Sequence, residues 1–252
     1  MISFMKATSV FLENLPFLIA LSLSFISSAR ADTVLNNPGI PESESLELSD
    51  RIDQHTGYVV AQVDISVQRE NDKKTYFIKV AEGELFVNEI QLDYNHLTTI
   101  SENRYDYKTG QLVESYLNDG NGKVHFFNRE NGIDKHFCDN DKNIYSRYAY
   151  FLSFGGFPFA VGKSVFFSSY VSEYGDALPM KLSCIAKEFV TVQAGVFDCY
   201  KLELAVAGWQ SFFSSDKYYL YYAVESPHRF IKYEEKDKNG KWYANELIKI
   251  IN

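Results

Sequence analysis

The chain has 252 residues, of which 25 are lysine or arginine and 33 are aspartate or glutamate, so its formal net charge is −8. This acidic balance argues against nucleic-acid binding and against attraction to anionic lipid head groups, both of which need a basic surface. Phenylalanine and tyrosine occur 20 and 18 times, beside only 3 methionines. Because both aromatic residues favour half-buried pleated surfaces, the composition indicates β structure.

Residues 1–31 are predicted to be a cleavable signal peptide. Lys6 lies near the start, an apolar run covers residues 15–26, and an A-x-A pattern predicts cleavage between Ala31 and Asp32. The run is shorter than the roughly 20 residues that a comfortable membrane span needs, and an uncleaved anchor is the alternative. No second run of spanning length follows. We therefore expect a periplasmic protein without a transmembrane segment after cleavage.

Residues 32–55 are polar, carry Asn-Asn-Pro-Gly at 36–39, and are expected to form a flexible leader. Strict alternation of apolar and polar residues then begins, and over residues 58–68 it predicts a strand that is buried on one face. Similar runs follow as far as residue 137. Turn signals such as Asn131-Gly132 separate them, so this half is predicted to be an antiparallel meander.

Residues 144–154 interrupt the alternation. Tyr145, Tyr148 and Leu152 fall on one helical face, and a Gly155-Gly156 pair follows, so one short helix is predicted near residues 144–154. Alternating strands resume at residue 163 and continue to residue 251. The predicted fold is all-β: residues 56–252 form a single domain, built on a large, strongly curved antiparallel sheet that is rich in meanders. A sheet of roughly ten to twelve strands must curl or split, so an open or half barrel is expected.

Two loops resemble ligand-binding motifs but depart from them at required positions. Five residues separate Gly156 from Gly162, where a phosphate-binding loop has four, and a strand rather than a helix is expected to follow. Residues 139–143 match the start of a calcium-binding loop, but Ile144 stands where that loop needs glycine. We expect neither nucleotide nor calcium binding.

Histidines and carboxylates show no catalytic or metal-binding pattern. His136 and Cys138 share a strand face, but a structural zinc site needs four ligands and the other histidines are scattered. No Gly-x-Ser-x-Gly elbow is present, and no pair of carboxylates stands out. We therefore expect no metal, no cofactor and no enzymatic activity, with a hydrolase of unrecognised motif as the third hypothesis.

Three cysteines, Cys138, Cys184 and Cys199, permit one disulfide after export. Folding a hairpin about a turn near Ala194-Gly195 places Cys199 opposite about residue 190, too far from Cys184 for a bridge. A bridge, if one forms, is expected to join Cys138 to Cys184 or to Cys199. Three unpaired, buried thiols are the alternative.

The stretch Lys187-Glu-Phe-Val-Thr-Val-Gln-Ala-Gly-Val-Phe-Asp-Cys-Tyr-Lys-Leu-Glu203 resembles the signature hairpin of the family called domain of unknown function 3108. The resemblance covers about residues 145–251. It implies an exported bacterial protein with a curved antiparallel sheet, similar to periplasmic lipoprotein and lipid carriers, and it carries over no catalytic residue. Within the motif, Gly195, Phe197, Cys199 and Tyr200 are interpreted as determinants of the fold.

The leading hypothesis is a non-enzymatic binder of an apolar ligand, a lipid or a lipidated peptide, on the concave face of the sheet, because aromatic residues are in excess on a sheet too large to stay flat. A filled core is the equal alternative. A protein-interaction or structural module of the cell envelope is the second hypothesis. The sequence leaves the oligomeric state open. The residues expected on the concave face are Val63, Ile65, Val67, Leu202, Leu204, Val206, Tyr218, Leu220 and Tyr222.

Overall fold

The computed structural model describes residues 35–52, 59–121, 123–138, 144–171, 176–208, 217–236 and 242–251. Over these residues the chain forms one sheet with short helical turns. The first eight strands are β1 (Ser43–Ile52), β2 (Val59–Glu70), β3 (Lys73–Glu82), β4 (Phe86–Asp93), β5 (Thr99–Asp106), β6 (Leu112–Asn118), β7 (Lys123–Asn128) and β8 (Ile133–Cys138). The remaining elements are β9 (Ile144–Tyr145), η3 (Arg147–Ala149), α1 (Tyr150–Ser153), η4 (Phe154–Gly156), β10 (Ser164–Val171), β11 (Asp176–Val192), β12 (Gly195–Val206), β13 (Lys217–Ala223), β14 (Phe230–Lys236) and β15 (Trp242–Ile251).

The sheet consists of two meanders. Strands β1 to β8 lie side by side in chain order, and so do β9 to β15. The meanders join where β1 pairs with β15 in antiparallel orientation. The short β9 pairs with β10 in parallel orientation, and every other pairing is antiparallel. The sequence prediction of a large, curved, meander-rich antiparallel sheet is confirmed.

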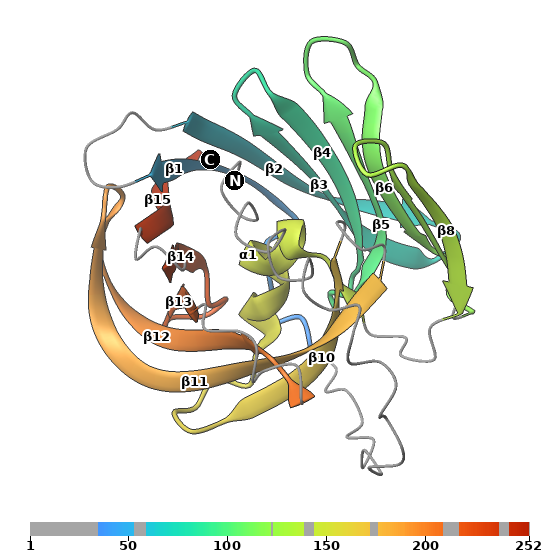
Figure 1. The fold of residues 1–252 in the computed structure, drawn as a ribbon. Helices are drawn as coiled ribbons and strands as arrows, with labels where there is room; N and C mark the ends of the chain where they lie inside the picture. The colour runs from blue at the N-terminus through green and yellow to red at the C-terminus, as the bar shows by residue number, and fades with distance from the viewer. Residues whose placement is uncertain are drawn as a thin grey trace.

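Alternation places the apolar residues on the inner face of the sheet. On β3, for example, Tyr76, Ile78 and Val80 are fully buried, and a partly or fully exposed residue precedes each of them. The helical segment from Arg147 to Gly156 lies inside the curve of the sheet, where α1 is visible in Figure 1. The core is therefore built from the concave face of the sheet together with this segment.

Close packing holds the helical segment at its C-terminal end. Gly156 stands against the backbone of Asn36, and a Cβ atom on Gly156 would come within 2.5 Å of the Asn36 carbonyl oxygen. Leu35 and Ile40, on either side of that contact, are buried in the core. Only glycine therefore fits where the segment before β1 crosses the end of the helical segment.

Aromatic side chains span the two ends of the sheet. Strands β8 and β9 are its outer strands in the described part of the chain. Tyr170 on β10 contacts Tyr116 on β6 and Phe126 on β7, with ring centroids 5.2 and 4.5 Å apart. Val124 and Ile144 complete this second apolar cluster, which we call the aromatic seam. The sheet is thus an open barrel whose opposite ends are packed together by side chains.

The prediction of a flexible leader over residues 32–55 is wrong for residues 43–52, which form β1 in the middle of the sheet. The physical reason is that Leu46 and Leu48 alternate with polar residues and are buried at 2% and 4% exposure, while the polar outer face dominates the composition. The predicted signal peptide, residues 1–31, lies outside the described residues.

Two other local predictions can be compared with the structure, and a third falls on residues that it does not describe. Residues 144–145 form β9, so the helical segment begins at Arg147, after Ser146 accepts a hydrogen bond from the Tyr148 amide. After the loop with Gly156 and Gly162, Ser164 begins strand β10, as expected, where a phosphate-binding loop would be followed by a helix. The calcium-like residues 139–143 lie outside the described residues. In the part of the chain that the structure describes, no helix has the length and apolarity of a membrane span.

Candidate functional site

The residues predicted to bind a ligand on the concave face lie on β2, β12 and β13. All of them belong to the main apolar cluster or pack against it, and that cluster also contains residues 148–152 of the helical segment. Val63, Leu202 and Tyr222 are fully buried, and the Tyr222 hydroxyl donates a 2.6 Å hydrogen bond to the Tyr150 carbonyl. This part of the concave face is packed against the protein's own chain, so a ligand must lie beside the helical segment.

Two adjoining pockets lie along one side of α1, and both are lined by Phe151 and Phe230. The two rings meet edge to face with centroids 6.5 Å apart. We call the two pockets together the Phe151–Phe230 crevice. Each pocket encloses only about 20 Å³ of free space, roughly the room that one water molecule needs. The crevice is therefore narrow, and a slender ligand would enter it by parting its apolar walls.

The walls of the crevice are mainly apolar. Leu48, Ala61 and Leu220 line the first pocket, and Ile40, Leu46 and Leu152 line the second. Only Leu220 belongs to the residues predicted from the sequence. Ala61 lies on the predicted strand β2 but was not singled out. The other wall residues come from the presumed leader, the helical segment and β14, whose meeting depends on the curvature of the sheet.

Each pocket of the crevice also has polar groups in its lining. In the second pocket, the Arg229 guanidinium donates to the Glu44 carboxylate, whose side chain is 9% exposed. In the first pocket, Arg147 and Asn245 form part of the wall. A mainly apolar lining with a few charged groups matches a ligand with an apolar body and a polar terminus.

Behind Arg147 lies a cluster of buried charged and polar side chains on β3 to β6. Arg104 makes two hydrogen bonds of 3.1 Å to the two carboxylate oxygens of Glu82, in a fork that suits this pair. Asn88 accepts from Arg104 at 3.1 Å and donates to Glu82 at 2.8 Å. These partners satisfy charges that would otherwise be costly to bury.

The cluster also contains Glu102, which is 1% exposed. Its Oε2 atom accepts a hydrogen bond from the Ser146 hydroxyl, which in turn accepts from the Tyr148 amide at the start of the helical segment. Burial and the nearby Glu114 raise the pKa of Glu102 to about 8. Three carboxyl groups face two arginines in this cluster, and a proton on Glu102 balances their charges.

A carboxylic acid with a raised pKa beside a second carboxylate is a pattern that enzymes use for acid–base chemistry. Here Glu102 and Glu114 are 1% and 5% exposed. A substrate would have to displace packed protein to reach them. The arrangement supports a structural role, in which the polar cluster fixes the helical segment against β5 through Ser146.

The residues of the hairpin motif lie in the β11–β12 hairpin. Its turn is Gln193-Ala194, one residue earlier than predicted, and Gly195 begins β12 with φ of +137°. Cys199 consequently lies opposite Glu188 rather than a residue near 190. Phe197 and Tyr200 pack against the main core, and the Tyr200 ring stacks on Phe159 with centroids 4.9 Å apart.

Cys184 and Cys199 are buried free thiols, and they are not cross-strand partners. The bridge considered for either of them with Cys138 stays a prediction. The side chain of Cys138 itself lies outside the described residues. Burial raises the pKa of the Cys199 thiol to about 12, which keeps it protonated and unreactive.

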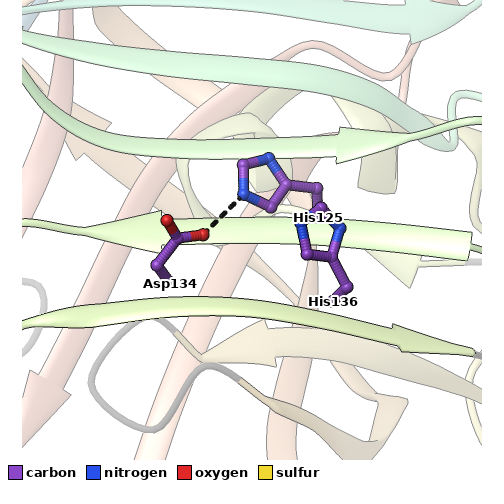
Figure 2. Close-up of side chains that lie close together, drawn as sticks. All are labelled: His125, Asp134 and His136. Carbon is purple, nitrogen blue, oxygen red and sulfur yellow. Dashed lines mark hydrogen bonds and ion pairs between the residues drawn. The ribbon is translucent and has the colours of Figure 1, made fainter.

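Two histidines that are far apart in the sequence pattern meet on the β7–β8 hairpin. His125 and His136 are direct cross-strand partners, and Asp134 lies beside them, as Figure 2 shows. Sequence reasoning considered His136 together with Cys138 and treated His125 as one of the scattered histidines. The Asn131-Gly132 pair marks the turn but not its length: a two-residue turn there would place His125 opposite residue 138, whereas the loop spans residues 129–132 and places it opposite His136.

Comparison with known proteins gives neither a family model nor a curated protein that matches the chain. Among solved structures, a β-barrel-like protein of domain of unknown function DUF1849 from Brucella abortus aligns with 87% of this chain and 99% of its own, at 9% identity and a TM-score of 0.44. A protein from Parabacteroides distasonis described as a lipoprotein aligns with 87% of this chain and 100% of its own, at 13% identity and a TM-score of 0.36. At these values we take nothing about function from either protein.

Proposed function

We propose that this protein is a non-enzymatic binder of an apolar, chain-like ligand, such as the acyl chain of a lipid or of a lipidated peptide. The binding site is the Phe151–Phe230 crevice between α1 and the strands around β1 and β14. The observation that carries this proposal is the pair of adjoining apolar pockets, which share two aromatic walls and include charged groups in their lining. Export to the periplasm, and kinship with the family of domain of unknown function 3108, belong to the same proposal.

The narrow, apolar lining of the crevice defines the class of ligand. A slender chain that parts the walls would contact both aromatic rings, and burial of apolar area contributes about 25 cal/mol per Å². A bulky ring system would require a larger displacement of the helical segment, which the Tyr222–Tyr150 hydrogen bond and the core hold in place. The terminal polar group of the ligand would lie beside Arg229 or Arg147.

The test is to fill the crevice without changing the rest of the molecule. Ala61 lines the first pocket and is 5% exposed, whereas the preceding Val60 points outward and is 37% exposed. Ala61→Leu is expected to weaken binding of a dansyl-labelled undecanoic acid by more than tenfold, because the added carbons occupy the pocket. The matched control, Val60→Leu, adds apolar volume on the outer face and is expected to bind the probe like the wild type.

Binding is measured by the rise in dansyl fluorescence on titration of the purified protein, followed by displacement with unlabelled fatty acid. Thermal unfolding of both variants confirms that they are folded. The proposal is refuted if the wild type does not bind the probe, or if Ala61→Leu binds it as tightly as Val60→Leu does.

A second candidate function, an interaction module of the cell envelope, is favoured by one observation. Phe189 and Val196 are 78% and 65% exposed near the tip of the β11–β12 hairpin. Large apolar side chains that stand out on a strand pair mark contact sites for other proteins. A photo-crosslinking amino acid at position 189 is expected to give one discrete product in intact cells, and the same group at position 181 is expected to give none. Equal labelling at both positions would contradict this role.

A further inference from the structure

The β7–β8 hairpin carries three potential metal ligands on one face. His125 lies directly opposite His136, and Asp134 is two residues before His136 on the same strand. Because side chains alternate along a strand, all three point to the same side of the hairpin. That side is the outer one: Val124 and Phe126, which flank His125, are buried, whereas Asp134 and His136 are exposed. Figure 2 shows the two imidazoles and the carboxylate converging.

The distances place the donor atoms near the spacing that a metal ion needs. The Nε2 atom of His125 is 2.8 Å from Oδ1 of Asp134, and the two imidazole rings stack with centroids 4.2 Å apart and an interplanar angle of 15°. One donor atom from each of the three residues lies within 4.8 Å of the others. Ligands held tetrahedrally at about 2.1 Å from an ion are roughly 3.4 Å apart, so small side-chain rotations complete the site.

The exposure of the ligands makes those rotations easy. The side chain of Asp134 is 69% exposed and that of His125 is 35% exposed, so neither is held by core packing. A bound ion would replace the hydrogen atom in the hydrogen bond between His125 and Asp134. The cross-strand pairing fixes the backbone positions in advance, which lowers the entropy lost on binding.

We propose that His125, Asp134 and His136 form a binding site for a divalent transition-metal ion, with Zn²⁺ as the ion that suits the ligands best. Two imidazole nitrogens and one carboxylate oxygen are a ligand set typical of Zn²⁺, whereas Ca²⁺ and Mg²⁺ prefer oxygen ligands alone. Three protein ligands leave a fourth position for water, and the site faces solvent.

Binding would have a structural effect at the edge of the sheet. Strand β8 is an outer strand, and its only partner among the described strands is β7. Unpaired outer strands are prone to fray and to pair with other chains. An ion held by one ligand from β7 and two from β8 ties the outer strand to its neighbour and stabilises the hairpin.

The experiment is a titration of the metal-free, full-length mature chain with ZnCl₂, followed by calorimetry. The expected result for the wild type is saturable binding of one ion per chain, with Co²⁺ giving the visible absorption of a tetrahedral site. His125→Ala and His136→Ala are each expected to weaken binding by more than about tenfold. Asp134→Asn, which keeps a hydrogen-bonding group of the same shape, is expected to weaken it as well.

The control is His96→Ala, which removes an exposed histidine from the β4–β5 turn and is expected to leave Zn²⁺ binding unchanged. Zn²⁺ is also expected to raise the unfolding temperature of the wild type and of His96→Ala, but not that of a variant lacking both His125 and His136. The proposal is overturned if the wild type takes up no ion under these conditions, or if the variant lacking both histidines binds Zn²⁺ as the wild type does.

Discussion

Replacing Glu102 by glutamine is expected to change how the stability of the protein depends on pH. The Glu102 carboxyl group has a pKa of about 8 in the folded protein, against an ordinary value of 4.5, because it is buried and lies near Glu114. Between these two pH values the folded chain holds a proton on Glu102 that the unfolded chain has lost. Stability contributed by this group is therefore present below pH 4.5 and falls as pH rises towards 8.

The magnitude follows from the difference between the two pKa values. Each pH unit inside the window costs about 1.4 kcal/mol of unfolding free energy, so the interval of about 3.5 units from 4.5 to 8 corresponds to roughly 5 kcal/mol. Glutamine has no proton to lose and keeps an acceptor for the Ser146 hydroxyl. The difference in unfolding free energy between Glu102→Gln and the wild type should therefore grow by about 3 kcal/mol from pH 5.5 to pH 7.5, in favour of the variant.

The assay is urea unfolding followed by circular dichroism at pH 5.5, 6.5 and 7.5. Glu130→Gln, in the exposed turn between β7 and β8, is the control for a change of formal charge, and it should follow the wild type at every pH. Parallel stability curves for Glu102→Gln and the wild type across this range would refute the reasoning, because they would mean that Glu102 does not hold its proton in the folded chain.

Two further predictions concern packing. Gly156→Ala is expected to destabilise the fold by about 1–3 kcal/mol or more, because its Cβ would lie 2.5 Å from the Asn36 carbonyl oxygen. The control, Gly110→Ala, meets no atom within 4 Å and should cost only the strain of its positive φ. Thermal unfolding compares the two variants, and equal losses of stability would contradict the importance of the Asn36 contact. Tyr170→Phe is expected to be neutral or stabilising, since the buried Tyr170 hydroxyl has no hydrogen-bond partner among the described residues. Tyr170→Ala should cost about 3–5 kcal/mol, because it removes the ring from the aromatic seam. Urea unfolding measures the stability of both variants, and a large loss in Tyr170→Phe would contradict this prediction.

The strands could be predicted from the sequence because their signals are local. Alternation in β3 and the Asn-Gly turn before β8 are properties of a few adjacent residues, and the structure places strands at both. The flexible leader was predicted wrongly over residues 43–52 because composition outweighed the alternation of Leu46 and Leu48.

The candidate sites could not be predicted in the same way, because they depend on how the sheet curves. Phe151 and Phe230 meet only when the helical segment lies inside the barrel against β14. Glu102 and Arg104 look like ordinary polar positions of an exposed strand, and their burial follows from the same helical segment covering β5. His125 and His136 pair because the loop between β7 and β8 spans residues 129–132, a length that the Asn-Gly pair does not reveal. Asp134 joins them because it points to the same face of β8 as His136.

The pairing of β1 with β15 has a consequence for the order in which the molecule assembles. Every other antiparallel pairing joins strands that are neighbours along the chain, so each hairpin can form as soon as its two strands are available. The β1–β15 pairing joins the two extremes of the described chain and carries the largest loop-closure entropy. We expect it to be the last to form, and a chain truncated before β15 would keep its hairpins but leave β1 and β14 as open, aggregation-prone edges. Because Ser45 lies opposite Ile251, a circular permutant that links these ends and opens at the Gly132 turn would turn this distant contact into a local hairpin and should fold faster.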